Sequence, residues 1–192
     1  MNHLHFVDKY GSFTMDKPEN VSYLYFPMAS ETGLKSSLTP NLGGDAKIDQ
    51  ETFLLEPVSA ENLHSNRGVR NFWLVDEDGQ AFSVSGASAR QEADRFTPAQ
   101  DDSRLTAGLM WQTVERTAQD LGLDTEVTAF CPWQDNVEIL CITVRNQQEQ
   151  PRWLTPIAAV PLYGRSADNI RDHRNVTSML HRIWTTERSE EH

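Results

Sequence analysis

Apolar and polar residues alternate with a period of two in the best-patterned part of the chain. Every second residue from 123 to 129 is apolar or β-branched, and the residues between them are mostly polar: the first set is Leu123, Thr125, Val127 and Ala129. Side chains of a strand point to opposite faces in turn, so this pattern predicts a strand with one face in a core.

Two further pairs of segments have the composition of β-hairpins. The β-branched stretch 137–144 is followed by the polar stretch 145–151 and by a second apolar stretch, 153–160, which predicts an antiparallel hairpin. A second hairpin is predicted over 70–84, where Asp78 and Gly79 supply the turn.

The remaining segments are less regular. Residues 107–117 are expected to form one strand, with Leu109, Trp111 and Thr113 on one face. The Pro-, Gly- and Asn-rich stretch 39–50 predicts a surface loop, and the polar stretch 91–104 predicts a mobile connection.

Signals for helices are weak. Ser59 could cap one turn over 59–63, and Ser166 could begin a short helix over 166–173. Many short strands separated by turns indicate an all-β fold, and we expect a large antiparallel β-sandwich with one or two short helices.

Length and charge narrow the classes of function. The 192 residues suffice for one domain, which we place at 1–187, with 188–192 as a frayed tail of a chain that is incomplete at its C-terminal end. Seventeen basic against 28 acidic residues give a net charge of −11, which disfavours nucleic-acid binding. No apolar stretch is long enough to cross a membrane, so no membrane partner is expected.

The cysteines and the N-terminus suggest a compartment. Cys131 and Cys141 do not make a disulfide framework, and each is expected to be a free, buried and inert thiol. The first residues show no basic segment followed by an apolar one, so no signal peptide is expected. These observations together predict a cytoplasmic protein.

None of the common catalytic motifs is present. The histidines lack the spacing of a metal site, Gly43 and Gly44 lack the context of a phosphate-binding loop, and no Gly-x-Ser-x-Gly occurs. Acidic pairs fall in predicted loops, where nothing would raise the pKa of a catalytic acid. We therefore predict no catalytic residue, no metal site and no cofactor in this chain.

A dense polar run follows the last apolar segment. Arginine and aspartate side chains suit sugar hydroxyls, and the arginine fork also fits phosphate, so the run is a candidate for substrate binding; a salt-bridged loop that braces the sandwich is the simpler alternative. The candidates are Arg165, Asp168, Asn169, Arg171, Asp172, His173 and Arg174.

Two aromatic residues are candidates for stacking on a sugar ring. Tyr163 precedes the polar run directly, and Trp73 lies in the predicted strand that starts at residue 70. For Trp73 we expect packing in the core as the more ordinary role, because Phe72 and Trp73 must divide between the two faces of their strand.

Several segments together resemble a known family. They resemble the opening of one branch of glycoside hydrolase family 94, the cellobiose, laminaribiose and related β-glucan phosphorylases, and the resemblance extends to about residue 187. The segments are 21–28, 53–59, 71–73, 136–139 and, most specifically, 163–181.

The resemblance implies a fold and an activity. Members of the family begin with a large antiparallel supersandwich, which a helical linker joins to an (α/α)6 barrel that carries the general-acid aspartate. They cleave a β-glucoside with inorganic phosphate as co-substrate and invert the anomeric centre. This chain lacks the barrel, so the resemblance implies that it is inactive alone.

The resemblance also implies partners and site residues. The sandwich domain of the family helps to form a homodimer and reaches toward the active site with one loop. His173 and Arg174 match a Gln–Arg pair linked to substrate contact in cellobiose phosphorylases, with histidine in place of glutamine. The alternatives are a free-standing carbohydrate-binding module and a purely structural dimerisation domain.

Overall fold

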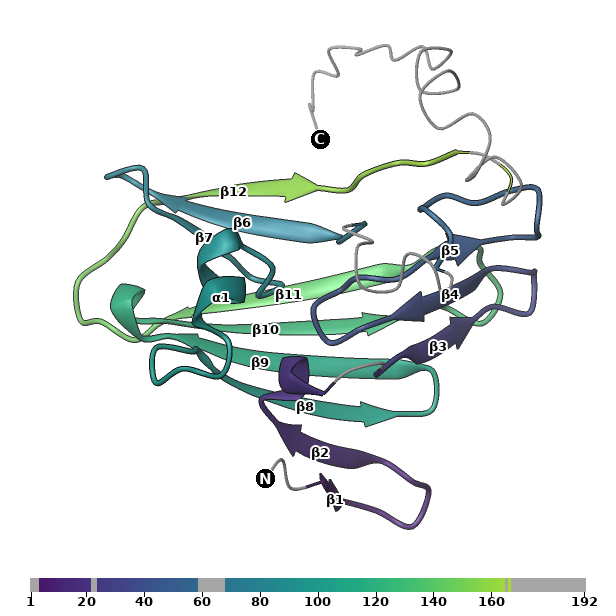
Figure 1. Cartoon of the computed structure of the whole chain (residues 1–192), viewed down its shortest axis with the longest axis horizontal. Helices are drawn as coiled ribbons and strands as arrows, with labels where there is room; N and C mark the ends of the chain where they lie inside the picture. The colour runs from purple at the N-terminus through teal and green to yellow at the C-terminus, as the bar shows by residue number, and fades with distance from the viewer. Residues whose placement is uncertain (1–3, 22–23, 59–67, 165, 167–192) are drawn as a thin grey trace.

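The chain forms three antiparallel sheets, arranged as a sandwich (Figure 1). The structure is a computed structural model that describes residues 4–21, 24–58, 68–164 and 166. The largest sheet has six strands in the order β1-β2-β8-β9-β10-β11. Its strands are β1 (Leu4–Phe6), β2 (Phe13–Asp16), β8 (Asp102–Gly108), β9 (Trp111–Ala118), β10 (Leu123–Phe130) and β11 (Ile139–Asn146).

Two three-stranded sheets accompany the six-stranded sheet. The first has the order β12-β6-β7, from β12 (Leu154–Ala159), β6 (Asn71–Asp76) and β7 (Ala81–Ser83). The second has the order β3-β4-β5, from β3 (Phe26–Ala29), β4 (Lys35–Leu38) and β5 (Ala46–Lys47). With one short α-helix, α1 (Ala89–Asp94), and the 3₁₀ turns η1 (Pro18–Asn20) and η2 (Gln119–Leu121), the described residues confirm the all-β sandwich.

The core lies where the sheets face one another. One buried cluster joins inward residues of β10, such as Leu123 and Val127, to Leu74 of β6 and Leu38 of β4. A smaller cluster joins Phe26 of β3 to β8 and β9. Burial of β10 alternates residue by residue along its whole length, so the predicted strand and its inward face are confirmed.

The predicted hairpin over 70–84 is also confirmed. β6 and β7 pair antiparallel, with Leu74 opposite Phe82. The Asp76 carboxylate accepts hydrogen bonds from the backbone N–H groups of Asp78 and Gln80, and Gly79 takes a positive φ of 78°. This is the turn chemistry that the Asp-Gly pair indicated.

The hairpin predicted between 137–144 and 153–160 is wrong. β11 pairs with β10 and β12 pairs with β6, so the two strands belong to different sheets. Each apolar strand pairs along its full length with a strand that precedes it in the sequence, and the polar connection crosses from one layer of the sandwich to the other.

The single strand predicted over 107–117 is a hairpin. β8 turns at Leu109 and Met110 into β9; Leu109 is 83% exposed and Met110 has φ 65°. No Gly, Asn or Asp marks the turn itself, which is why the pattern concealed it.

The predicted loops contain regular structure. The stretch 91–104 includes part of α1 and the first residues of β8, and Ser88 and Gln91 form a capping box at the start of that helix. The stretch 39–50 includes β5, and Leu42 and Ala46 within it are buried. The helices expected at 59–63 and 166–173 lie outside the described residues, apart from Ser166, as does the proposed tail.

None of the described helices has the length and apolar character that crossing a bilayer requires.

Candidate functional site

A groove of about 1160 Å³ opens beside the β12-β6-β7 sheet. Its walls come from segments far apart in the sequence: η1 and the residues after it, the 39–44 loop, β6, the α1 region and the end of β12. The described residues that line it are Glu19, Val21, Leu24, Tyr25, Thr39, Pro40, Asn41, Gly43, Gly44, Val58, Val69, Asn71, Trp73, Ala87, Ala89, Glu92, Arg95, Ala158, Ala159, Val160 and Pro161.

Trp73 supplies the largest aromatic surface of the groove. Along β6, Leu74 is buried in the core and Phe72 packs against it. The side chain between them therefore points to the other face, where Trp73 is half-buried and lines the groove. Phe72, rather than Trp73, takes the role in the core.

Polar groups stand next to this indole. Asn71 lines the groove two residues before Trp73, and its side-chain oxygen accepts hydrogen bonds of 2.7 and 2.9 Å from the hydroxyls of Ser83 and Ser85. These bonds fix the amide so that its NH₂ group remains as a donor.

A charged wall faces the groove from the α1 region. Arg95 forms an ion pair with Glu92 at 3.1 Å, and it also donates a hydrogen bond to the backbone oxygen of Glu19. All three residues line the groove. Buried polar atoms without a partner in the described residues include Arg95 Nε on this wall and Asn41 Oδ1 on the 39–44 loop, so both walls retain unused hydrogen-bonding capacity.

Arg70 holds the loop wall in place. Its guanidinium, 3% exposed, donates to the backbone oxygens of Leu42, Gly43 and Gly44 at 3.3 to 3.4 Å. It pairs with Glu138 through two contacts, at 2.5 and 3.0 Å. The loop 39–45, which was predicted as a surface loop, is therefore held in a fixed position.

Gly44 shows how closely this loop is packed. It has φ 112°, and a Cβ placed there would lie 2.0 Å from the backbone oxygen of Ser37. Only glycine fits such a position.

A second buried polar cluster lies under η1. Ser103 and Gln100 donate hydrogen bonds to the carboxylate of Glu19, and Arg116 lies 3.4 Å from it. Burial raises the pKa of Glu19, but the charge of Arg116 and the hydrogen bonds outweigh that effect and hold the pKa below its ordinary value. Glu19 is thus a carboxylate that anchors the groove wall, not a proton donor at neutral pH.

Tyr163 marks where the predicted substrate-binding run begins. Its N–H donates to the backbone oxygen of Leu54 at 2.7 Å, and its hydroxyl donates to the backbone oxygen of Ser166 at 3.2 Å. Val160 and Pro161, just before it, line the groove. The chain therefore passes from the groove directly into the candidate run.

The other predicted substrate-binding residues lie outside the described part of the chain. They are Arg165, Asp168, Asn169, Arg171, Asp172, His173 and Arg174. Their role stays a prediction.

The two cysteines differ in their surroundings. Both are free, as expected, but Cys141 is exposed on β11, so the expectation that it is buried is wrong. Burial and the nearby Glu138 raise the pKa of the Cys131 thiol to about 11, with Arg70 opposing them. Cys131 is therefore protonated at neutral pH.

No metal centre is formed by the described residues, since they bring no three His, Cys, Asp or Glu side chains together in a suitable cluster.

The sequence matches a family described as "Glycosyl hydrolase 94, supersandwich domain" over residues 46–190. The chain belongs to this family. The match includes the groove residues from β6, the α1 region and the end of β12, and the whole candidate run after Tyr163, whereas the groove residues between 19 and 44 precede it. No curated protein matches the sequence.

Strands β1 to β4 precede the matched residues, yet they belong to the same fold. Phe13–Asp16 of β2 pairs with β8, and Phe26 of β3 packs in a core cluster with β8 and β9. The N-terminal strands therefore extend the supersandwich domain rather than form a separate unit.

Sequence reasoning missed several groove residues. Glu92 and Arg95 fell in the stretch expected to be mobile, although the Ser88-x-x-Gln91 pattern is a signal for a helix start. Asn41 and Gly43 come from the predicted surface loop, and no local signal shows that a distant arginine fixes that loop.

Proposed function

We propose that this chain is the N-terminal carbohydrate-binding and assembly domain of a β-glucoside phosphorylase of the cellobiose, laminaribiose or β-glucan type. The complete enzyme would cleave its substrate with inorganic phosphate and release a sugar 1-phosphate with inversion. Membership of the supersandwich family supports this role. The family resemblance implies that the general acid belongs to a separate barrel.

The placement of Trp73 carries the carbohydrate-binding part of the proposal. An indole that lines a groove, beside an amide and an Arg–Glu pair, offers both surfaces that a pyranose needs: an apolar plane and planar hydrogen-bonding groups. Val160 and Pro161, which line the groove, shortly precede the candidate run in the sequence, and this closeness along the chain supports a contact of the run with the same sugar.

Calorimetry of the chain with cellotriose and laminaritriose tests this part. We expect binding by the natural chain and at least a tenfold weaker affinity, about 1.4 kcal/mol, for Trp73→Ala. Trp133→Ala is the matched control, because Trp133 is 69% exposed and does not line the groove. Equal affinities of the Trp73→Ala variant and the natural chain would contradict the role of Trp73.

The candidate run is tested in the complete enzyme. Arg174→Ala should raise the Michaelis constant for the acceptor sugar or for phosphate, because an arginine fork that binds either group is lost. An unchanged Michaelis constant for both substrates would contradict a role of Arg174 in substrate binding.

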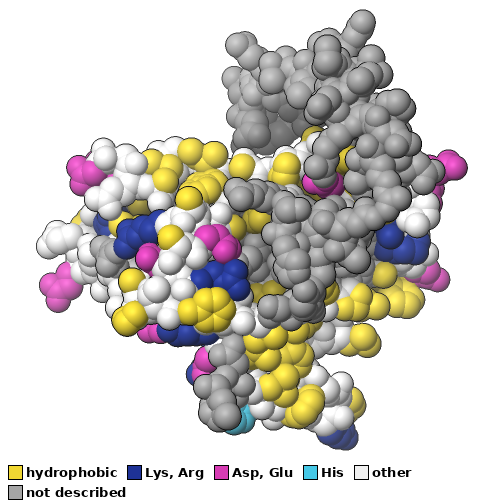
Figure 2. Space-filling model, viewed as in Figure 1, with side chains coloured by type: hydrophobic (Ala, Val, Ile, Leu, Met, Phe, Trp, Pro, Cys, Tyr) yellow, Lys and Arg dark blue, Asp and Glu magenta, His cyan; other side chains and the backbone are white. Residues whose placement is uncertain are grey.

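Strand β12 supports the assembly part of the proposal. Within the described residues it pairs with β6 alone, and it exposes Ile157 (46%), with Trp153 before it and Val160 and Leu162 after it. Figure 2 shows hydrophobic side chains along the upper edge of the molecule, where β12 runs. An exposed apolar strip of this kind is typical of a protein interface, and we infer that a second copy of the chain covers it.

Sedimentation of the chain over a range of concentrations tests the dimer. Ile157→Arg should shift the protein toward the monomer, whereas Leu109→Arg, at a more exposed turn in another sheet, should not. A natural chain that is monomeric at all concentrations would contradict the proposed dimer.

A further inference from the structure

The outer face of the six-stranded sheet carries side chains in regular cross-strand rows. Pairing places Trp111 between Gly108 and Phe130 in one row, and Thr113 between Thr106 and Thr128 in the next. Rows on one face are two residues apart, which is about 7 Å along a strand. The rows therefore form a continuous surface across β8, β9 and β10.

Trp111 lies against the sheet because its neighbour has no side chain. A Cβ at Gly108 would approach the indole nitrogen of Trp111 to 2.5 Å. The glycine thus leaves space for the indole to cover the backbone of β8, and Trp111 remains half-buried at the sheet surface. Covering a strand glycine is the ordinary structural role of such an aromatic residue.

The threonine row continues the surface from this indole. The hydroxyls of Thr113 and Thr128 share a hydrogen bond of 2.9 Å in which either can donate. Each hydroxyl keeps further hydrogen-bonding capacity toward solvent, so this row offers both donors and acceptors.

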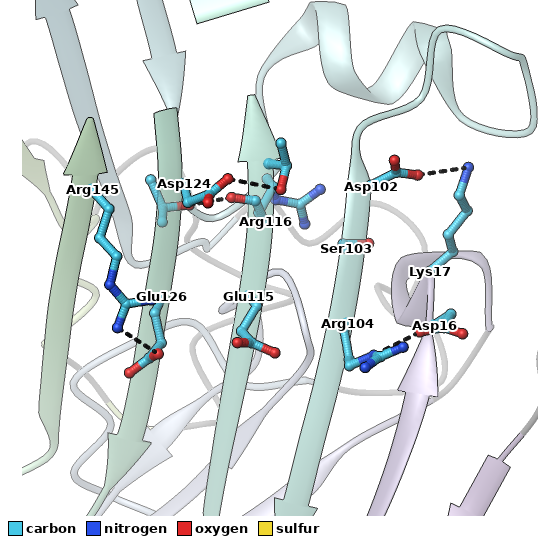
Figure 3. A pocket seen from close by; sticks show the side chains of 12 residues that line it. Asp16, Lys17, Asp102, Ser103, Arg104, Glu115, Arg116, Asp124, Glu126 and Arg145 are labelled. Carbon is cyan, nitrogen blue, oxygen red and sulfur yellow. Dashed lines mark hydrogen bonds and ion pairs between the residues drawn. The ribbon is translucent and has the colours of Figure 1, made fainter. Parts of the chain in front are cut away.

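Beyond the threonines the surface is hollowed and charged (Figure 3). A hollow of about 590 Å³ is lined by side chains of β2, β8, β9, β10 and β11. Ion pairs join Arg104 to Asp16 at 2.9 Å and Arg145 to Glu126 at 3.7 Å across neighbouring strands.

Glu115 stands between these two ion pairs. It lies opposite Arg104 on one side and Glu126 on the other, and within the described residues its carboxylate forms no ion pair or side-chain hydrogen bond (Figure 3). The carboxylate acts on Arg104 through its charge alone, so it can still accept hydrogen bonds at the centre of the hollow, about 13 Å along β9 from Trp111.

We propose that this face is a second carbohydrate site, which binds a short β-linked oligosaccharide along β9 with one ring on Trp111 and hydroxyls on Thr113, Thr128 and Glu115. Sugar hydroxyls donate and accept, so they can use carboxylates, guanidinium groups and threonine hydroxyls alike. The charges select against other ligands: acidic side chains in the hollow outnumber basic ones, which disfavours phosphate groups and nucleic acids.

The choice of an oligosaccharide as the ligand of the second site rests on the proposed function. The residues of the second site differ from those of the Trp73 groove. The described residues that line the hollow and those that line the Trp73 groove do not overlap. The two sites can therefore be removed one at a time.

Titration with cellotriose and laminaritriose, followed by calorimetry and tryptophan fluorescence, tests the second site. We expect the natural chain to show two binding events, and Trp111→Ala and Glu115→Gln each to weaken one of them at least about tenfold. The event that Trp73→Ala removes should persist in both variants. Trp133→Ala, at an exposed tryptophan outside both sites, is the matched control.

Glu115→Gln keeps the test valid if removal of the Trp111 indole disturbs β8, because Glu115 is exposed and forms no ion pair or side-chain hydrogen bond with the residues that the structure describes. A single event that only Trp73→Ala abolishes would overturn the second site and leave the proposed function standing. Loss of both events in Trp73→Ala alone, or binding of inorganic phosphate in place of the sugars, would also overturn the second site.

Discussion

Arg70 and Arg116 are both 3% exposed and both face a glutamate, but they differ in how completely their donors are used. Every nitrogen of Arg70 has a partner: Nε and Nη2 contact Glu138, and Nη1 donates to the carbonyls of the 39–45 loop. Arg116 reaches Glu19 and Asp101 with Nη1 only, at 3.4 and 3.7 Å. Its Nε and Nη2 have no partner among the described residues.

The difference shows that burial of an arginine does not by itself indicate how much the arginine contributes to stability. A fully bonded guanidinium can join distant segments, as Arg70 joins the groove loop to Glu138. A partly bonded guanidinium keeps much of its desolvation penalty. Arg116 is also packed tightly against Gly86, where an added Cβ would lie 2.3 Å from Arg116 Nη2.

Removal of Arg70 should have the largest effect on stability. Arg70→Met leaves Glu138 without its cation and frees the loop carbonyls, so we expect a loss of about 3–5 kcal/mol in the free energy of unfolding, measured with urea. Arg104→Ala breaks an exposed pair and should lower the free energy of unfolding far less than Arg70→Met. Equal losses of stability in the two variants would contradict the larger contribution expected of Arg70.

A double variant separates charge from packing at Arg116. Arg116→Met leaves the buried carboxylate of Glu19 uncompensated and should destabilise by about 3 kcal/mol. Adding Glu19→Gln removes that charge but keeps an oxygen for Ser103 and Gln100, so the double variant should recover at least about 1 kcal/mol. If the double variant is no more stable than Arg116→Met, packing rather than charge holds this cluster.

Acid should affect the Glu19 cluster in a defined direction. The pKa of Glu19 is held below its ordinary value of 4.5, so its contribution to stability is present above pH 4.5 and is lost as the pH falls through the lowered pKa. Glu19→Gln should therefore have a flatter decline of stability in this acid range than the natural chain. Urea unfolding measured at several pH values checks this, and parallel declines would contradict it.

The smallest effect concerns the thiol of Cys131, which lies near Arg70 and Glu138. Cys131, with a pKa raised to about 11, should react with iodoacetamide far more slowly at pH 8 than the exposed Cys141. Mass spectrometry of the labelled peptides checks the order. Faster labelling of Cys131 would show that its surroundings open in solution.

The sequence predicted strands best where one face is apolar and both edges are paired. β10 meets both conditions, and its bounds match those expected from the alternation. β12 is as apolar in composition, yet nearly all of it is exposed, and the hairpin expected for it does not form. Periodicity identifies a strand, but its partner depends on the rest of the fold.

The candidate site could be predicted only in part. Trp73 and Tyr163 could be identified from the sequence as aromatic residues beside polar ones. Which of Phe72 and Trp73 faces the core could not be predicted, because it depends on the side of β6 that packs against the other sheets. The fixed loop 39–45 depends on Arg70, which is 25 residues or more away from the carbonyls that it binds. Contacts at such separation leave no trace in a local pattern.

The pairing of β6 with β12 also sets an order of events during synthesis. β6 leaves the ribosome well before β12, so its edge toward β12 stays open while β8 to β11 are made and paired. Closing so long a loop is entropically costly and slow, and an open edge can pair with another chain in the meantime. The closure of the three-stranded sheet is therefore a step at which a nascent chain is vulnerable to aggregation.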